Sequence, residues 1–113
     1  MTRTSSFDLA KGSRNAGTAF LILSSLADGE KHGYALTKDV ENFAGVRLAP
    51  GTLYEALARL ETHGLIEPIP SEDRRRPYRL TANGAMALKE HVNAQAKILA
   101  ESQRRLSRHW SPA

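Results

Sequence analysis

The sequence predicts a mainly α-helical protein with a small β-wing, in which a winged helix-turn-helix domain precedes a long C-terminal helix. Three observations support this fold class. Leu53, Leu57 and Leu60 recur at steps of four and three, the spacing of a helix with one buried side. Two short apolar runs then flank SEDRRRP, whose composition suits a hairpin tip. A helical pattern continues after the hairpin from residue 82 to about residue 109.

Size and composition bound the class of protein. The chain has 113 residues, a net charge of +4 and no cysteine, so we expect one modest domain without disulfides or thiolate metal sites. No apolar run approaches the length of a membrane span, and the N-terminal residues show no secretory pattern. We therefore expect a cytoplasmic protein without a membrane partner. The predicted parts are a flexible arm over 1–14, a winged domain over 15–81 and a helix over 82–113.

The first half of the chain contains two predicted helices. The first follows Asn15, a plausible N-cap, and ends before Asp28-Gly29. The second runs from Tyr34 to about Ala44, with Leu36, Val40 and Phe43 expected to face the core. The stretch from Val46 to Leu48 is long enough for a short third strand of the wing. The preceding arm either touches DNA through its basic residues or is a disordered start.

The third helix and the hairpin have clear start and stop signals. Pro50 suits the first turn of a helix, and Gly64 follows its last periodic residue. Ala49 cannot act as a side-chain cap, so we expect a less firmly held first turn. Extended runs over 65–69 and 78–81 form the hairpin, with Tyr78 packed inward and Arg79 facing solvent.

Three blocks of sequence resemble one family. They are HGYAL at residues 32–36, GTLYEALARLETHGLI at 51–66, and RRPYRLTANG at 75–84. Together, in this order and spacing, they are similar to the PadR-like transcriptional regulators, winged helix-turn-helix repressors of bacteria. The resemblance implies a homodimeric repressor that binds double-stranded DNA at a roughly palindromic operator. It also implies that the tyrosines of HGY and GTLY, here Tyr34 and Tyr54, contact the DNA backbone.

The outward face of the third helix supplies the candidate base-reading residues. A helix fits the major groove, where Arg59 can read guanine and Glu55 can accept from cytosine. Glu55 can instead pair with Arg59 four residues later, and Tyr34 can instead be a partly buried ring. The three wing arginines suit phosphates or the minor groove, although such a run is also typical of a solvated turn. The candidate DNA-binding residues are Tyr34, Pro50, Gly51, Thr52, Tyr54, Glu55, Arg59, Arg74, Arg75 and Arg76.

The last helix carries a second candidate surface. Thr81 is a good N-cap, and a helix of this length is too long to pack entirely on so small a domain. Its apolar stripe has heptad spacing, which favours pairing with a second copy. Folding back on the first helix of the same chain explains the beginning of the stripe but not its far end. Trp110 suits a hydrophobic anchor against the partner, or a stacking residue for an effector of unknown identity. The candidate dimer-interface residues are Leu88, Val92, Gln95, Leu99, Ser102, Leu106 and Trp110.

Other classes of function have weaker support. The four histidines are scattered and form no recognisable metal-ligand set, and no nucleophile-elbow, phosphate-loop or dinucleotide pattern is present. We therefore expect no cofactor, no metal and no enzymatic activity. The MarR-like regulators share the wing but have longer flanking dimerisation helices. A winged-helix module that binds another protein and reads no DNA is the alternative, but the polar third helix beside the arginine run disfavours it.

Overall fold

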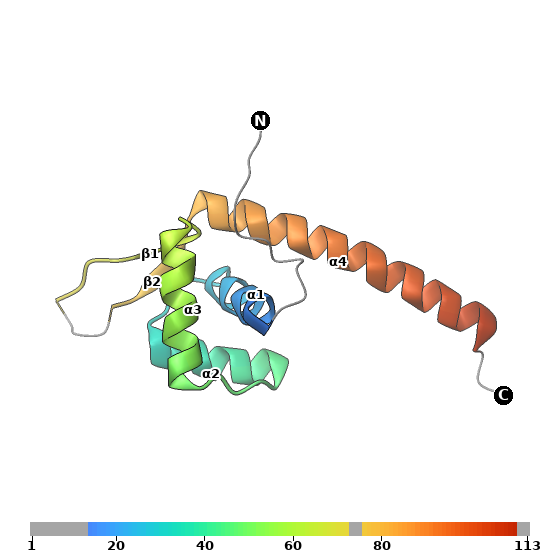
Figure 1. Ribbon diagram of the computed structural model, residues 1–113, viewed down its shortest axis with the longest axis horizontal. Helices are drawn as coiled ribbons and strands as arrows, with labels where there is room; N and C mark the ends of the chain where they lie inside the picture. The colour runs from blue at the N-terminus through green and yellow to red at the C-terminus, as the bar shows by residue number, and fades with distance from the viewer. Residues whose placement is uncertain (1–13, 73–75, 111–113) are drawn as a thin grey trace.

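The computed structural model describes residues 14–72 and 76–110, with side chains from Gly17 onward. The elements are α1 (Arg14–Leu26), α2 (Gly33–Ala44), α3 (Pro50–Thr62), β1 (Ile66–Pro68), β2 (Tyr78–Leu80) and α4 (Ala82–His109) (Figure 1). This mostly helical architecture with a two-stranded wing confirms the predicted fold class. The predicted arm lies outside the described residues except for Arg14. Because α1 begins at Arg14, Asn15 lies within the helix, and its prediction as the N-cap was wrong.

The core is formed where α1, α2 and α3 pack together behind the two strands. Its members are apolar side chains spaced at helical intervals, which is why three short helices enclose one cluster. One predicted core residue is not part of it: Phe43 is 51% exposed. Phe43 fits the periodic stripe but lies in the last turn of α2, beyond the helices that cover Leu36 and Val40. The buried apolar residues are Ala19, Ile22, Leu23, Leu26, Leu36, Val40, Leu48, Leu53, Leu57, Leu60, Leu65 and Ile66.

The wing is an antiparallel pair of three-residue strands. Its register places Ile66 opposite Leu80 and Glu67 opposite Arg79, and the Arg79 Nε donates to the Glu67 Oε2 at 2.6 Å. The third-strand position is occupied by Lys31, which forms an antiparallel bridge with Tyr78. The prediction of a strand over 46–48 was therefore wrong. The chain before α2, rather than the chain after it, reaches the free edge of β2.

The junction between α3, the wing and α4 is closely packed. Gly64 adopts φ 74°, a left-handed conformation that ends α3 and that glycine adopts without strain. The Thr81 hydroxyl donates to the Gly64 carbonyl at 2.7 Å and accepts from the Gly84 amide at 3.0 Å, which confirms Thr81 as the N-cap of α4. A Cβ on Gly84 would lie 2.0 Å from the Leu65 carbonyl oxygen. Only glycine allows this close approach of the first turn of α4 to the strand.

Helix α4 begins on the domain and then leaves it. Its early part packs against α1, where the Phe20 and His91 rings meet edge to face with centroids 4.5 Å apart. Figure 1 shows the rest of α4 extending past the end of α1, on the side of the molecule opposite the wing. At 28 residues it is about 42 Å long at 1.5 Å per residue. Within the described ranges, no helix combines the length and the apolar character needed to cross a membrane.

Candidate nucleic-acid interface

Helix α3 separates a buried side from an outward polar side. Leu53, Leu57 and Leu60 are buried against α1, α2 and β1. Thr52 and Glu55 are exposed and Arg59 is half-buried. No ion pair joins Glu55 to Arg59 within the described ranges, so the predicted pairing is not seen. The Arg59 guanidinium and the Glu55 carboxylate, both on the face that points away from the core, therefore remain available to a ligand.

The N-terminus of α3 has backbone donors but no capping side chain. Ala49 is the N-cap in an extended conformation and Pro50 occupies the first turn. The first intrahelical bond runs from the Leu53 amide to the Ala49 carbonyl at 2.9 Å. No side chain caps the preceding amides of Gly51 and Thr52. Pro50, Gly51 and Thr52 are exposed, so these amides form a site at a helix N-terminus that favours a negatively charged group.

The two predicted backbone-contacting tyrosines lie in the first turn of α2 and the second turn of α3. Tyr34 is 67% exposed and Tyr54 is 57% exposed, so Tyr34 is not the partly buried ring of the alternative interpretation. The Lys38 Nζ lies 6.0 Å from the centroid of the Tyr34 ring, one helical turn away. The Tyr54 ring lies against the buried Gly33 at the first position of α2, since a Cβ there would lie 2.8 Å from the Tyr54 hydroxyl.

The wing lies next to α3 through its strand β1. Figure 1 shows the hairpin projecting from one side of α3. Arg76 is exposed, whereas Arg74 and Arg75 lie outside the described residues. Tyr78 packs against the core and Arg79 is exposed, as predicted. Burial, and then the nearby Glu61 carboxylate, raise the pKa of the Tyr78 phenol, while Arg76 opposes the shift. Tyr78 therefore remains protonated at the base of the wing.

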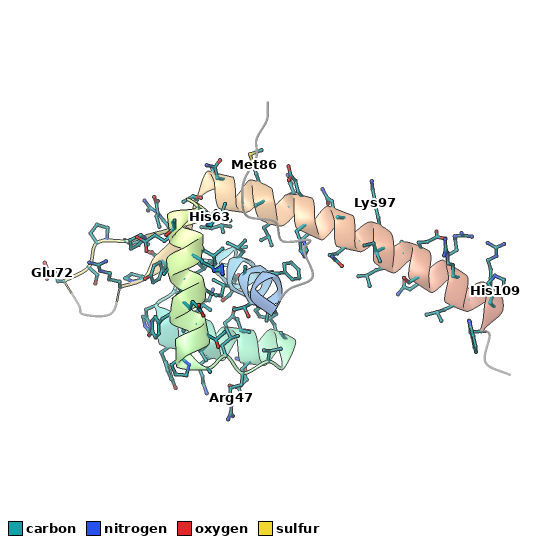
Figure 2. All side chains as sticks on the ribbon, viewed as in Figure 1. Arg47, His63, Glu72, Met86, Lys97 and His109 are labelled. Atoms are coloured by element: carbon teal, nitrogen blue, oxygen red, sulfur yellow. The ribbon has the colours of Figure 1, made fainter. Side chains whose placement is uncertain are left out.

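Helix α4 exposes an apolar stripe along its far part. Leu88 and Gln95 are half-buried, and Leu88 packs against the core cluster. Ser102 and the remaining residues of the predicted heptad stripe, or seam, are exposed. Figure 2 shows Met86 and Lys97 projecting from the edge of α4 that faces away from α1. The exposed apolar residues of the predicted seam are Val92, Leu99, Leu106 and Trp110, and Ile98 lies exposed beside them.

Polar pairs accompany this stripe near the end of α4. The Arg104 and Arg105 guanidinium groups both donate to the Glu101 carboxylate, at 2.6 Å and 2.7 Å for their shortest bonds. These hydrogen bonds, that from Arg104 first, lower the pKa of Glu101. Across the described residues, no group of three or more His, Cys, Asp or Glu side chains could hold a metal ion.

Comparison with known proteins identifies the family. A model of the transcriptional regulator PadR-like family matches residues 22–90. The chain belongs to this family. This span contains α2, α3, the wing and the first turns of α4, and so includes the outward face of α3, whereas the exposed apolar stripe of α4 lies mostly beyond it.

The chain is also similar to individual proteins. The chain is 37% identical over 91 residues to transcriptional regulator Rv3488 of Mycobacterium tuberculosis, covering 78% of this chain and 84% of that protein. It is 41% identical over 85 residues to an uncharacterized 37.1 kDa protein in transposon TN4556 of Streptomyces fradiae, covering 75% of this chain but 25% of that protein. A crystal structure of a PadR family transcription regulator from hypervirulent Clostridium difficile R20291 superposes with a TM-score of 0.71 and 29% identity, covering 79% and 97% of the two chains.

Two residues of this PadR-like chain escaped the sequence-based prediction of the surfaces. Gly33 does not have a positive φ, so no local conformation requires glycine there. Glycine is needed because the Tyr54 ring packs on it, and this contact depends on how α2 packs against α3. Ile98 is exposed next to Leu99. Its signal was present in the sequence, because it is an apolar residue beside a heptad position on a helix with few other contacts.

Proposed function

We propose that this PadR-like regulator is a homodimeric, sequence-specific DNA-binding repressor that responds to a small molecule. The observation that carries the proposal is the outward face of α3, where Thr52, Glu55 and Arg59 lie opposite the buried leucines. The exposed Arg76 lies on the neighbouring wing. A helix of this kind fits the major groove, while the wing reaches the adjacent phosphates or minor groove.

Within this proposal the two kinds of contact have different roles. Arg59 can donate two hydrogen bonds to guanine, and Glu55 can accept from cytosine, so both discriminate between sequences. Pro50 and Gly51 let the helix approach closely, while the amides of Gly51 and Thr52 suit a phosphate. Tyr34, Tyr54 and the wing arginines Arg74, Arg75 and Arg76 would bind the backbone and add affinity without reading bases.

The long helix supports the proposal of a homodimer. Exposed apolar residues at heptad spacing are costly in water and are typical of a helix that packs against a second helix. A two-fold dimer through α4 would present two copies of α3 to successive major grooves. The two half-sites would then lie about 34–36 Å apart on a roughly palindromic operator.

Repression and response to an effector extend the proposal. Repression is the mode of action that membership of the PadR-like family implies. An effector would act by changing the angle between the two α4 helices and hence the spacing of the two α3 helices. Trp110 is 76% exposed, which suits either contact with the partner subunit or stacking on such a ligand. A regulator of this kind would act without a catalytic step and in the compartment that holds the DNA, the cytoplasm.

A binding titration tests the proposed function. The purified protein is titrated against DNA from upstream of its own gene and against scrambled DNA of equal length, at two salt concentrations. Tight binding to the first that persists at the higher salt, beside weak and steeply salt-dependent binding to the second, is the expected result. No binding to either DNA at low salt would contradict the proposal and favour the protein-interaction module.

A further inference from the structure

Lys31 lies at the centre of a partly buried polar cluster that the DNA-binding surface does not explain. Its side chain is 15% exposed, and its Nζ donates to the Ser25 carbonyl at 2.6 Å and to the Gly29 carbonyl at 3.3 Å. The Asp39 Oδ2 lies 3.9 Å from the same Nζ and accepts from the Ser25 hydroxyl at 2.7 Å. Ser25 is almost fully buried. The cluster therefore joins the end of α1, the middle of α2 and the segment between them.

The position of the Lys31 ammonium is electrostatically favourable. It lies at the C-terminal end of α1, where the helix dipole attracts a cation, and the Ser25 carbonyl that it binds also accepts from the Asp28 amide at 3.2 Å. Asp39 adds an opposite charge from α2. The long side chain therefore holds the backbone of residue 31 against two helices of the core.

The backbone of Lys31 is in turn the neighbour of the wing. The Tyr78 amide donates to the Lys31 carbonyl at 2.9 Å, and the Lys31 amide donates to the Tyr78 carbonyl at 3.1 Å. Tyr78 is the first residue of β2 and lies two residues after Arg76. A hairpin with strands of three residues is marginally stable alone, so contacts with the rest of the domain fix its orientation, and this bridge is the one at the free edge of β2.

We infer that Lys31 is a positioning residue for the wing. Its side chain is held by Ser25, Gly29 and Asp39. Its backbone pairs with Tyr78 and thereby positions Arg76, two residues earlier in the chain. The cluster thereby sets the position of the wing cation relative to the reading face of α3. This inference rests on the proposed DNA-binding function, and it assigns Lys31 a role in affinity without any contact to DNA.

Amide hydrogen exchange in the DNA-free protein tests the anchor itself. In Lys31→Met, the apolar stem is kept and the ammonium is removed, while the Ser25 hydroxyl keeps its Asp39 acceptor. The Tyr78 amide should exchange about tenfold faster, equivalent to roughly 1.4 kcal/mol of local stability, while the amides of Leu57 and Leu60 in α3 stay protected. Asp39→Asn, which retains an acceptor for Ser25, should give a smaller change at the same amide. Lys97→Met removes an equal charge from the far face of α4 and should change neither region.

Footprinting on the operator tests the consequence for binding. In Lys31→Met, the DNA sites covered by the wing should lose protection, while protection in the major groove should remain. The salt slope of DNA binding should fall by about 0.9 for each phosphate that the wing no longer neutralises. Disappearance of all protections together would show a general failure of the fold and overturn the inference, as would unchanged exchange at Tyr78. An intact wing footprint in Lys31→Met would overturn it while leaving the proposed function in place. Absence of any wild-type footprint would instead overturn the proposed function and this inference together.

Discussion

The hydroxyl oxygen of Tyr54 lies 2.8 Å from the position that a Cβ atom on Gly33 would occupy. Gly33 begins α2 and Tyr54 lies in the second turn of α3, so this close approach connects the start of one helix to the outward surface of the next. Since Gly33 is helical, the requirement for glycine here is one of space rather than of backbone conformation.

Gly33→Ala should weaken operator binding with little effect on stability. The added methyl group displaces the end of an exposed side chain, so the free energy of unfolding should change by no more than about 1 kcal/mol. If the Tyr54 hydroxyl binds a phosphate, its displacement should reduce affinity about tenfold, or ~1.4 kcal/mol. A double-mutant cycle with Tyr54→Phe provides the control, because without the hydroxyl the methyl group should have little further effect. Additive losses would show that the two residues act independently.

Arg59→Ala and Arg76→Ala should differ in kind. Loss of Arg59 removes a base contact and should reduce discrimination between operator and mismatched DNA by about 1–3 kcal/mol. Loss of Arg76 should weaken binding to all sequences and lower the salt slope by about 0.9. Titrations against operator and scrambled DNA at several salt concentrations separate the two effects. If neither substitution changed affinity or salt slope, α3 and the wing would not be the DNA-binding surface.

Leu99→Glu should dissociate the proposed dimer. A glutamate at this position would place an unpaired charge between two α4 helices, so the dimer dissociation constant should rise at least about a hundredfold, or ~2.7 kcal/mol. Sedimentation equilibrium measures this constant. Asn93→Glu adds the same charge on an exposed part of α4 five residues from Leu88, about 140° around the helix, and should leave the dimer intact. Equal behaviour of the two variants would contradict an interface through the seam.

Gly84→Ala should be strongly destabilising. A Cβ at this position would lie 2.0 Å from the Leu65 carbonyl oxygen and 2.9 Å from the Leu80 Cδ1, so the first turn of α4 must move away from the wing. We expect a decrease of about 1–3 kcal/mol in the free energy of urea unfolding at fixed protein concentration. Gly17→Ala is the matched control, because nothing lies within 4 Å of its Cβ position in α1, and it should stabilise by about 0.5–1 kcal/mol.

Tyr78 should make the stability of the protein fall at high pH. Its pKa is raised above 10.0, by burial first and by Glu61 second, so the folded protein holds the phenol proton more tightly than the unfolded chain does. The resulting stabilisation is complete below about pH 10 and is lost as the pH rises through the folded pKa. Tyr78→Phe should remove this dependence from urea unfolding curves and also remove one phenolate absorbance change above the ordinary tyrosine range. Retention of both would exclude Tyr78 as their source.

Local signals predicted the positions of α3 and α4 well. Proline at Pro50, glycine at Gly64 and the Thr81 cap each act through the backbone conformation or hydrogen bonds of their own turn. Sequence alone was therefore sufficient to place these helix ends. The outward row of α3 followed from the same periodicity, since its buried leucines leave only one face for polar residues.

The features that were missed depend on contacts between distant segments. The bridge to Tyr78 is made by Lys31 alone, outside any strand, so no periodic pattern in the sequence marks it. Val46 is β-branched, as strand residues often are, but in the described part of the chain no strand edge lies beside it to pair with. Phe43 fits the apolar stripe of α2, but no helix covers that end of it. The bond between Ser25 and Asp39 joins residues that are 14 apart in sequence, and neither residue marks such a pairing locally. The predicted roles of the DNA-binding and dimer-interface residues stay predictions.

The start of α3 has no capping side chain, and this lowers the stability of the helix while leaving its first amides available for the proposed DNA contact. A serine at position 49 would raise the stability of the helix by about 1 kcal/mol, because its hydroxyl would accept from the amide of Gly51 or Thr52. The same hydroxyl would occupy the donors that are available for a phosphate in the proposed complex. Ala49 thus leaves the reading helix less stable in the free protein than it could be, and binding would supply the missing acceptor. Stabilising substitutions at this turn should therefore be the ones that a functional selection rejects.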